Sequence, residues 1–280
     1  MKIEEIIRLA LEEDIGSGDH TSLAIVSAEA MGKSKLLIKE AGILAGVEIA
    51  KQVYQQLDPS LRFETVLNDE AVVKPGDIAF YISGSSRSIL SGERLALNFM
   101  QRMSGIATAT SQIVKLVSGT GVRILDTRKT TPLLREIEKT AVRMGGGENH
   151  RMGLYDMIMI KDNHVDFAGG ISKAIDAVED YLRLKVEGLR LKVEIEVRNI
   201  DELEEVMDRG GVDRIMLDNF NVTDLARAVK MIGGRFETEA SGGINIHNIR
   251  EYAETGVDFI SVGALTHHIK SLDMSLKSFI

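Results

Sequence analysis

The stretch VEIEVRNIDELEEVMDRGGVDRIMLD, residues 193–218, contains two short apolar runs on either side of a helical pattern. The runs at 193–197 and 215–218 have the length and β-branched content of buried strands. Residues 201–209 place their apolar side chains on one face, which predicts an amphipathic helix. A strand, a helix and a strand in this order predict two parallel strands joined by a crossover.

The same alternation continues on both sides of this stretch. Further strand-like runs that end in polar residues occupy 122–126, 157–161, 236–240 and 259–263, and further helices are expected at 223–232 and 246–255. The alternation predicts an α/β fold with a parallel sheet, either closed as a barrel or open and doubly wound. Six units are too few for the usual eight-unit barrel of roughly 250 residues. We therefore expect a reduced, incomplete α/β barrel.

The first hundred residues show a different pattern, which indicates a small α+β domain. It has a helix from residue 3 that ends at the turn-rich 14–19, a second helix at 47–56, and short β-type runs at 34–38, 63–66 and 78–83. Residues 88–118 follow as one long helical segment, in which Gly105 is the expected break.

Composition excludes several classes of chemistry. The chain has 280 residues, a formal net charge of −8 and no cysteine. The missing cysteine excludes thiolate nucleophiles, cysteine-bound zinc, iron–sulfur clusters and disulfides. The acidic balance argues against general nucleic-acid binding, and at first sight against an acidic ligand.

The N-terminal sequence and the hydropathy favour a soluble protein. MKIEEIIRLALEEDIG, residues 1–16, carries acidic residues within its apolar pattern, unlike a signal or transit peptide. No stretch approaches the roughly 18 apolar residues of a membrane span. We expect a cytoplasmic protein with no membrane partner.

Positive charge is concentrated in one part of this acidic chain. Between Arg123 and His164 eight basic residues stand against six acidic ones, a balance of +2, which leaves −10 for the remainder. Four basic residues follow or end predicted strands, where parallel α/β folds place their active sites: Arg128, Lys129, Arg151 and Lys161. Together, arginine and lysine suit a multiply charged anion. The basic and acidic residues of the helix between them are instead expected to form a solvated face: Arg135, Glu138, Lys139 and Arg143.

Glycine-rich turns follow the last two predicted strands. Ser241-Gly242-Gly243 and Gly263-Ala264 precede helix-like segments, and barrels often bind phosphate with backbone N–H groups at this position. Plain strand-to-helix turns also use glycine, so both interpretations stay open. The triple glycine at 145–147 is no P-loop, and the chain has no GxGxxG fingerprint.

Two carboxylates lie on one face of the strand at 193–197. Glu194 and Glu196 are two residues apart, so both point to the same side. Glu194 either points outward in a salt bridge or points into the barrel, where it needs a partner. Glu196 is the better functional candidate because it lies nearer the carboxyl end, where it and Asp218 could bind sugar hydroxyls or Mg²⁺.

Histidine gives no metal motif, since the chain lacks HExxH or any other tight metal spacing. His150 and His267 lie beside the basic and glycine-rich segments, where each could donate to phosphate or pyrophosphate oxygens.

At these residues the sequence resembles the quinolinate phosphoribosyltransferases, also called nicotinate-nucleotide pyrophosphorylases (carboxylating). The matching stretches are LEEDIGSGDHTS at 11–22, GERLALNFMQRMSGIATAT at 92–110, LDTRKTTPLLREIEKTAVRMGGGENHRMGLYDMIMIKDNH at 125–164, VEIEV at 193–197, IMLDN at 215–219, and SGGI with YAETGVDFISVGALTH to residue 267. They span nearly the whole chain, and the block at 125–164 is highly specific.

The resemblance implies an activity and a fold. The expected reaction converts quinolinate and phosphoribosyl pyrophosphate to nicotinate mononucleotide, CO₂ and pyrophosphate with Mg²⁺, in de novo NAD biosynthesis. The expected fold is a small α+β sandwich at 1–110, a reduced α/β barrel at 111–268, and a segment at 269–280 that returns to the first domain. A homodimer with shared active sites is also implied, and the state beyond a dimer stays open.

The resemblance also assigns roles residue by residue. Arg94 is expected to reach the active site of a partner subunit. The catalytic residues are expected to be Lys129, Lys161, Glu196 and Asp218, and substrate contacts also fall on Thr127, Arg128, His150 and Arg151. The 5′-phosphate is expected at Ser241, Gly242, Gly243, Gly263 and His267, with Mg²⁺ near Glu196 and Asp218, directly or through the substrate.

Two positions depart from the family pattern: Leu133, where glycine commonly follows TTP, and His268, at a variable position.

Three alternatives to this function remain. They are a related phosphoribosyltransferase-like protein with a changed substrate, a lyase that forms a Schiff base on Lys129 or Lys161, and a non-catalytic metabolite-binding protein.

Overall fold

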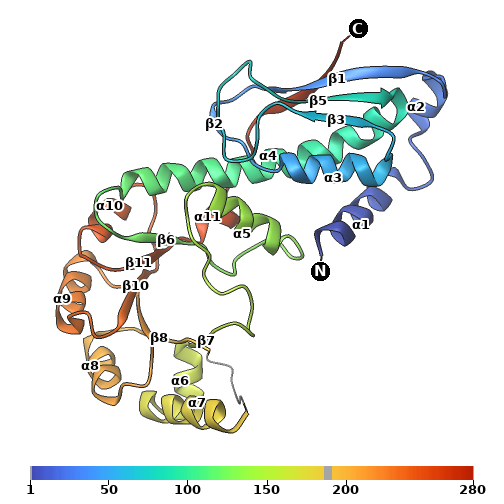
Figure 1. Ribbon diagram of the computed structural model, residues 1–280. Helices are drawn as coiled ribbons and strands as arrows, with labels where there is room; N and C mark the ends of the chain where they lie inside the picture. The colour runs from blue at the N-terminus through green and yellow to red at the C-terminus, as the bar shows by residue number, and fades with distance from the viewer. Residues whose placement is uncertain (1, 186–190, 280) are drawn as a thin grey trace. The chain divides into compact units, whose positions relative to one another are not determined.

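The computed structural model describes residues 2–185 and 191–279, so residues 1 and 280, the outer ends of two predicted segments, lie outside it. The chain forms two compact units (Figure 1). The first contains Met1–Gln112, Thr130–Gly146 and Leu265–Ile280, and the second contains Ile113–Lys129 and Gly147–Ala264. The boundaries expected near residues 110 and 268 lie close to two of these edges, but residues 130–146 group with the first unit.

The first unit is built on an antiparallel sheet in the order β12-β1-β5-β3. Its strands are β1 (Met31–Ile38), β3 (Arg62–Thr65), β5 (Ile78–Ser85) and β12 (Met274–Phe279), and β2 (Gly42–Ile43) pairs separately with β4 (Val72–Val73). The helices of this part of the chain are α1 (Ile3–Ile15), α2 (His20–Ile25), α3 (Val47–Leu57), α4 (Ser86–Leu116), α5 (Arg135–Met144) and α11 (Ala264–His267). Because β12 pairs with β1, the expected return of the C-terminal segment is confirmed.

Apolar side chains fill the interior of this sheet. Phe80 is fully buried on β5, and its ring stacks on Phe63 with centroids 4.3 Å apart. Tyr54 of α3 meets both rings at 6.3 and 6.4 Å. Burying each such side chain contributes about 1.5–3 kcal/mol of hydrophobic stabilisation.

The expected break at Gly105 is wrong, since α4 is one continuous helix from Ser86 to Leu116. A β-carbon at Gly105 would lie 2.2 Å from the carbonyl oxygen of Lys270. The glycine is therefore explained by the close approach of the backbone near residue 270.

The expected solvated face on α5 is also wrong at two positions, because Glu138 and Lys139 are fully buried. Glu138 pairs with Arg102 of α4, whose Nε donates to Glu138 Oε1 at 2.9 Å. Arg102 also donates to Thr131 Oγ1 at 2.7 Å and to the Thr266 carbonyl at 3.3 Å. A charge pattern along one helix could not reveal this partner, which lies 36 residues earlier in the chain.

The second unit is built on a six-stranded parallel sheet in the order β6-β11-β10-β9-β8-β7. The strands are β6 (Arg123–Leu125), β7 (Ile158–Ile160), β8 (Val193–Val197), β9 (Arg214–Asp218), β10 (Glu237–Ser241) and β11 (Phe259–Ser261). This sheet confirms the predicted α/β class and its reduced barrel of six units. Its helices are α6 (Asp162–Ala168), α7 (Ile171–Lys185), α8 (Ile200–Arg209), α9 (Val222–Ile232) and α10 (Ile249–Ala253).

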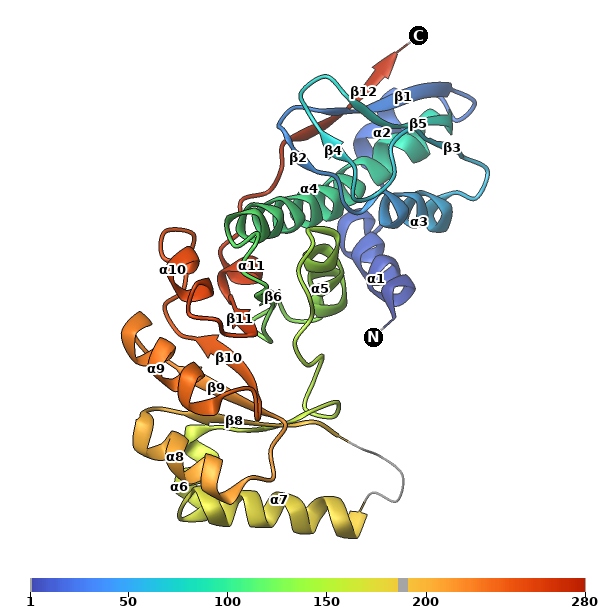
Figure 2. The same ribbon diagram turned by 60° about the vertical axis from the view of Figure 1, so that its left-hand side comes forward.

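Helices α8, α9 and α10 lie along one side of this sheet in both views (Figures 1 and 2). Asn199 and Asn221 begin α8 and α9 by accepting a hydrogen bond from a backbone N–H three residues on. Since all six strands run in the same direction, their carboxyl ends lie at one edge of the sheet. No helix in the described part of the chain is long and apolar enough to cross a membrane.

Candidate active site

Lys161 and Glu196 form an ion pair at the carboxyl edge of the parallel sheet. Ile160 of β7 lies opposite Ile195 of β8. Lys161 follows Ile160 and Glu196 follows Ile195, so these two residues are neighbours across the two strands. The Glu196 side chain is 12% exposed and that of Lys161 is 41% exposed. A lysine ammonium is therefore held at the edge by a largely buried carboxylate.

Asp218 ends the neighbouring strand β9, and Asn219 holds its carboxylate. Asn219 Nδ2 donates to Asp218 Oδ2 at 2.6 Å, and the Asn219 backbone N–H donates to the Ser241 carbonyl at 2.8 Å. The backbone of Asn219 is left-handed, with φ of 58°. Asparagine tolerates this conformation better than most residues.

The glycine turn after β10 packs directly against Asn219. A β-carbon on Gly242 would lie 2.2 Å from Asn219 Oδ1, and φ at Gly242 is 94°. Gly243 follows with φ of 64° and is exposed. Gly242 thus requires glycine for close packing as well as backbone conformation, and the left-handed backbone of Gly243 favours glycine.

Three of the predicted residues follow β6, directly after the fully buried Asp126. Thr127 and Arg128 are half-buried and Lys129 is exposed, and Thr127 Oγ1 accepts a hydrogen bond from the Lys129 backbone N–H at 3.0 Å. Within residues 2–185 and 191–279, the buried Nε of Arg128 has no hydrogen-bond partner. A buried donor of this kind calls for an explanation, and an anionic ligand provides one.

Arg151 lies near enough to Arg128 for the two charges to oppose each other. Burial lowers the pKa of Arg151, and the positive charge of Arg128 lowers it further. Arg151 is 8% exposed, and its guanidinium donates to the Met157 carbonyl at 3.4 Å. Two partly buried arginines that repel each other are stabilised when an anion binds between them, because the anion pairs with both positive charges.

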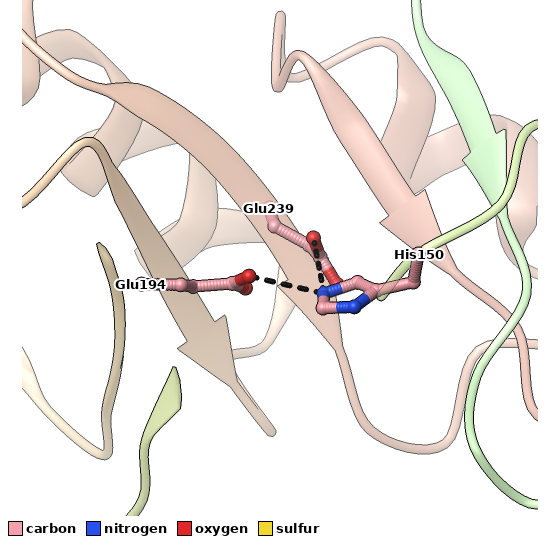
Figure 3. Close-up of side chains that lie close together, drawn as sticks. All are labelled: His150, Glu194 and Glu239. Atoms are coloured by element: carbon pink, nitrogen blue, oxygen red, sulfur yellow. Dashed lines mark ion pairs between the residues drawn. The ribbon is translucent and has the colours of Figure 1, made fainter. Parts of the chain in front are cut away.

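The interior of the sheet contains a charged cluster of His150, Glu194, Glu239 and Arg214, here called the buried cluster. Figure 3 shows the first three of these side chains. His150 Nε2 lies 3.0 Å from Glu194 Oε2 and 3.5 Å from Glu239 Oε2. Arg214 donates to Glu239 Oε2 at 2.8 Å. Both glutamates are fully buried, while the side chains of His150 and Arg214 are 6% and 7% exposed.

The two carboxylates near Nε2 raise the pKa of His150. Burial alone would lower the pKa of His150, but hydrogen bonds and charges from Glu194 and Glu239 outweigh it and raise the pKa to about 9. Burial and the charge of Glu239 raise the pKa of Glu194. Of the two positions left open for Glu194, the structure therefore has the inward one, with His150 as partner.

The structure distributes the sequence-predicted residues between the two units. Arg94 is exposed on α4 and His267 is exposed at the end of α11, both in the first unit. The second unit brings the remaining ones to the carboxyl edge or the interior of its sheet: Thr127, Arg128, Lys129, His150, Arg151, Lys161, Glu196, Asp218, Ser241, Gly242, Gly243 and Gly263.

No role was predicted from the sequence for four residues of this region: Arg214, Glu239, Asn219 and Asp126. The signal for Arg214 and Glu239 was present, because charged residues within runs that read as buried parallel strands need partners. Asp126 Oδ1 accepts a hydrogen bond from the His150 backbone N–H at 2.9 Å, a contact that sequence spacing does not reveal.

Comparison with known proteins identifies the family. Residues 19–104 match the N-terminal domain and residues 106–277 the C-terminal domain of quinolinate phosphoribosyl transferase. The chain belongs to the quinolinate phosphoribosyltransferase family. The resemblance read from the sequence is thereby confirmed.

Individual relatives match over nearly the whole chain. A mitochondrial quinolinate phosphoribosyltransferase [decarboxylating] 2b of Nicotiana tabacum is 44% identical, over 98% of this chain and 82% of the relative. A probable nicotinate-nucleotide pyrophosphorylase [carboxylating] of Bacillus subtilis is 38% identical, over 99% and 93%. The crystal structure of NadC from Streptococcus pyogenes superposes with a TM-score of 0.93 at 39% identity, covering 99% of this chain and 97% of that one.

Proposed function

We propose that this enzyme, a pentosyltransferase, transfers the phosphoribosyl group of phosphoribosyl pyrophosphate to quinolinate with decarboxylation. The products are nicotinate mononucleotide, CO₂ and pyrophosphate, which makes the reaction a step of de novo NAD biosynthesis. The observation that carries the assignment of the substrate site is the Arg128–Arg151 pair, with its buried and unsatisfied Arg128 Nε. Quinolinate has two adjacent carboxylates, and two guanidinium groups match that charge and planar geometry.

Lys161, Glu196 and Asp218 act on the transfer step. The pyridine nitrogen of quinolinate bonds to the anomeric carbon while the bond from that carbon to pyrophosphate breaks, so positive charge develops on the sugar. The carboxylates of Glu196 and Asp218 stabilise that charge when the ribose lies against them. The Lys161 ammonium, oriented by its ion pair with Glu196, contributes positive charge toward the anionic substrates. Lys129, exposed after β6, contributes a further positive charge.

Decarboxylation follows from the new bond to nitrogen. The ring becomes cationic and accepts the electron pair when the neighbouring carboxylate leaves as CO₂, and a proton then takes its place on that carbon. No covalent bond to the enzyme is needed in either step.

The glycine turns are proposed to bind the 5′-phosphate. Gly242 and Gly243 are held in left-handed backbone after β10, so no side chain there blocks an approaching phosphate. Ser241 ends β10, and Gly263 lies two residues after the end of β11. His267 remains a predicted phosphate contact.

Mg²⁺ is the proposed cofactor, and the residues present fit it. Glu196 and Asp218 offer the oxygen ligands that Mg²⁺ prefers. Glu196 is already paired with Lys161, so the phosphates of the substrate would have to supply further ligands. When bound, the ion stabilises the leaving pyrophosphate. With EDTA we expect turnover to stop while quinolinate binding, followed by calorimetry, persists.

A homodimer with shared sites is proposed for the assembled enzyme. Arg94 is exposed, and no hydrogen bond or ion pair to its side chain occurs within the described ranges. The neighbouring α2 carries Leu23 and Ile25 at 49% and 78% exposure, apolar surface that a partner subunit would cover. Mixing an inactive Arg94→Ala variant with an inactive Lys161→Ala variant is expected to restore activity. A flat result after confirmed subunit exchange would refute sharing.

We also propose a cytoplasmic location. A chain without cysteine has no need of an oxidising compartment. Fractionation of cells that express the full-length gene tests this, and recovery of the enzyme in an organelle or membrane fraction would contradict it.

The central experiment measures nicotinate mononucleotide and CO₂ from the two substrates and Mg²⁺, together with quinolinate binding by calorimetry. Arg128→Ala and Arg151→Ala are expected to weaken quinolinate binding by at least tenfold, since each removes a charge-assisted contact worth about 1.5–3 kcal/mol. Arg183→Ala is the control, because Arg183 is exposed on α7, where it pairs with Asp180. Unchanged affinity in both active-site variants would refute the assignment.

A further inference from the structure

The buried cluster is more polar than the stability of the sheet requires. Four ionisable side chains, all of them buried, lie together in the interior of the parallel sheet. Replacing buried ion pairs by well-packed apolar residues is often neutral or stabilising. Stability alone therefore does not explain why this interior carries charge.

The cluster fixes one side of the His150 ring. Glu194 comes from β8 and Glu239 from β10, two strands that flank β9, and their carboxylates meet at Nε2 (Figure 3). Arg214 of β9 in turn binds Glu239. Nε2 is thus held by carboxylates from two strands, one of which is itself held by Arg214.

The other side of the ring lies against the backbone of the next residue. Nδ1 accepts a hydrogen bond from the Arg151 backbone N–H at 2.7 Å, and the His150 backbone N–H donates to Asp126 Oδ1 at 2.9 Å. Asp126 directly precedes the segment Thr127–Lys129. The position of the ring is thus coupled to the backbone of both segments that carry the proposed quinolinate ligands.

We propose that Glu194 and Glu239 are positioning residues for quinolinate binding, which act through the ring of His150 on the backbone of Arg151. This inference rests on the proposed quinolinate site. In this proposal the two glutamates do not contact the substrate. They fix the position and orientation of the His150 ring, and the ring fixes the position of the Arg151 backbone, from which the Arg151 side chain extends.

The test separates positioning from simple structural support. Glu194→Gln and Glu239→Gln keep the side-chain shape and remove the charge. Each is expected to raise the KM for quinolinate on the order of 10- to 100-fold, because small misplacements of a binding group have effects of this size. The KM for phosphoribosyl pyrophosphate is expected to stay within about twofold.

Glu237→Gln is the matched control. Glu237 lies on the same strand and also binds Arg214, at 3.1 Å, but it is not among the carboxylates that face His150. This variant is expected to keep the wild-type KM for both substrates.

A double-mutant cycle tests whether the effect passes through the ring. In a His150→Gln background, Glu239→Gln is expected to change the KM for quinolinate by less than about twofold, since the coupling has already been removed. Where a glutamine variant does not fold, Glu194→Asp and Glu239→Asp retain the charge but withdraw the oxygens, and the same rise in KM is expected.

Three results would overturn the proposal. One is a wild-type KM for quinolinate in folded Glu194 and Glu239 variants. Another is full additivity of Glu239→Gln with His150→Gln. The third is a stoichiometric metal ion in the purified wild type that Glu239→Gln removes, since the three side chains would then be ligands. The wild-type enzyme measured in parallel must bind and turn over quinolinate, and its failure would instead refute the proposed function.

Discussion

The two sheets differ in what their interiors contain. In the antiparallel sheet, Phe80 and its aromatic neighbours fill the space against α3. In the parallel sheet, the equivalent space holds the buried cluster. An apolar interior stabilises by area, whereas a charged interior stabilises one particular arrangement of groups. Substitutions in the first interior should therefore act on stability, and those in the second should act on function as well.

The largest expected effect is the loss of stability when a side chain of the apolar interior is removed. Phe80→Ala removes a fully buried ring and should lower the free energy of unfolding by about 3–5 kcal/mol, measured by urea denaturation. The folded fraction should keep the wild-type KM for quinolinate. Val72→Ala, at a side chain that is 80% exposed, should change stability by less than about 0.5 kcal/mol. A loss below about 1 kcal/mol for Phe80→Ala would contradict the role given to that ring.

A substitution at the carboxyl edge of the parallel sheet should instead lower the rate of turnover. Lys161→Ala removes the ammonium that Glu196 orients and should lower kcat by about 10²–10³-fold, with a Tm close to wild type. Lys192→Ala is the control, because Lys192 binds Glu237 near the start of β8. If both variants retained wild-type kcat, Lys161 would have no catalytic role.

The buried cluster should make stability depend on pH. The folded pKa of His150 is raised to about 9 from an ordinary value of 6.5. Its stabilising contribution is therefore complete below about pH 6.5 and is lost as the pH rises through about 9. The free energy of unfolding of wild type minus that of His150→Gln should be larger at pH 6 than at pH 9.5. An equal difference at both pH values would mean that the ring is uncharged in the folded enzyme.

The smallest expected effect concerns the departure from the family pattern at Leu133. Its φ of 67° lies in the left-handed region, which accounts for the glycine common at this position. Leu133→Gly should raise the free energy of unfolding by about 0.5–1 kcal/mol, because relief of strain exceeds the added chain entropy. Leu134→Gly, where φ is −92°, should instead destabilise. Equal effects at both positions would show that Leu133 is unstrained.

Local pattern was enough to place most elements of the parallel sheet. The predicted strand at 193–197 coincides with β8, and the predicted helix at 223–232 differs from α9 by one residue. The helix expected at 246–255 is only Ile249–Ala253. Asn245 and Asn248 donate to the Gly243 carbonyl, which holds the preceding residues in turns. Such side-chain bonds compete with helix formation, and apolar periodicity does not detect them.

The positions of the candidate residues at strand ends were predictable from the sequence, but the buried cluster was not. Strand-end position and residue type pointed to Arg128, Arg151 and Lys161 before any coordinates. The partners of Glu194 come from segments 44 and 45 residues away, so no local spacing could identify them. Only the folded sheet brings His150 and Glu239 to that carboxylate.

The pairing of β1 with β12 has a consequence for how the chain folds. Ser34 and Ser278, whose hydroxyls lie 3.1 Å apart across these strands, are separated by 244 residues. A ribosome must therefore make the whole parallel-sheet unit before the antiparallel sheet can receive its last strand. Contacts this distant in sequence form slowly. Until they form, β1 has a bare edge with unpaired backbone groups, the kind of surface through which nascent chains aggregate.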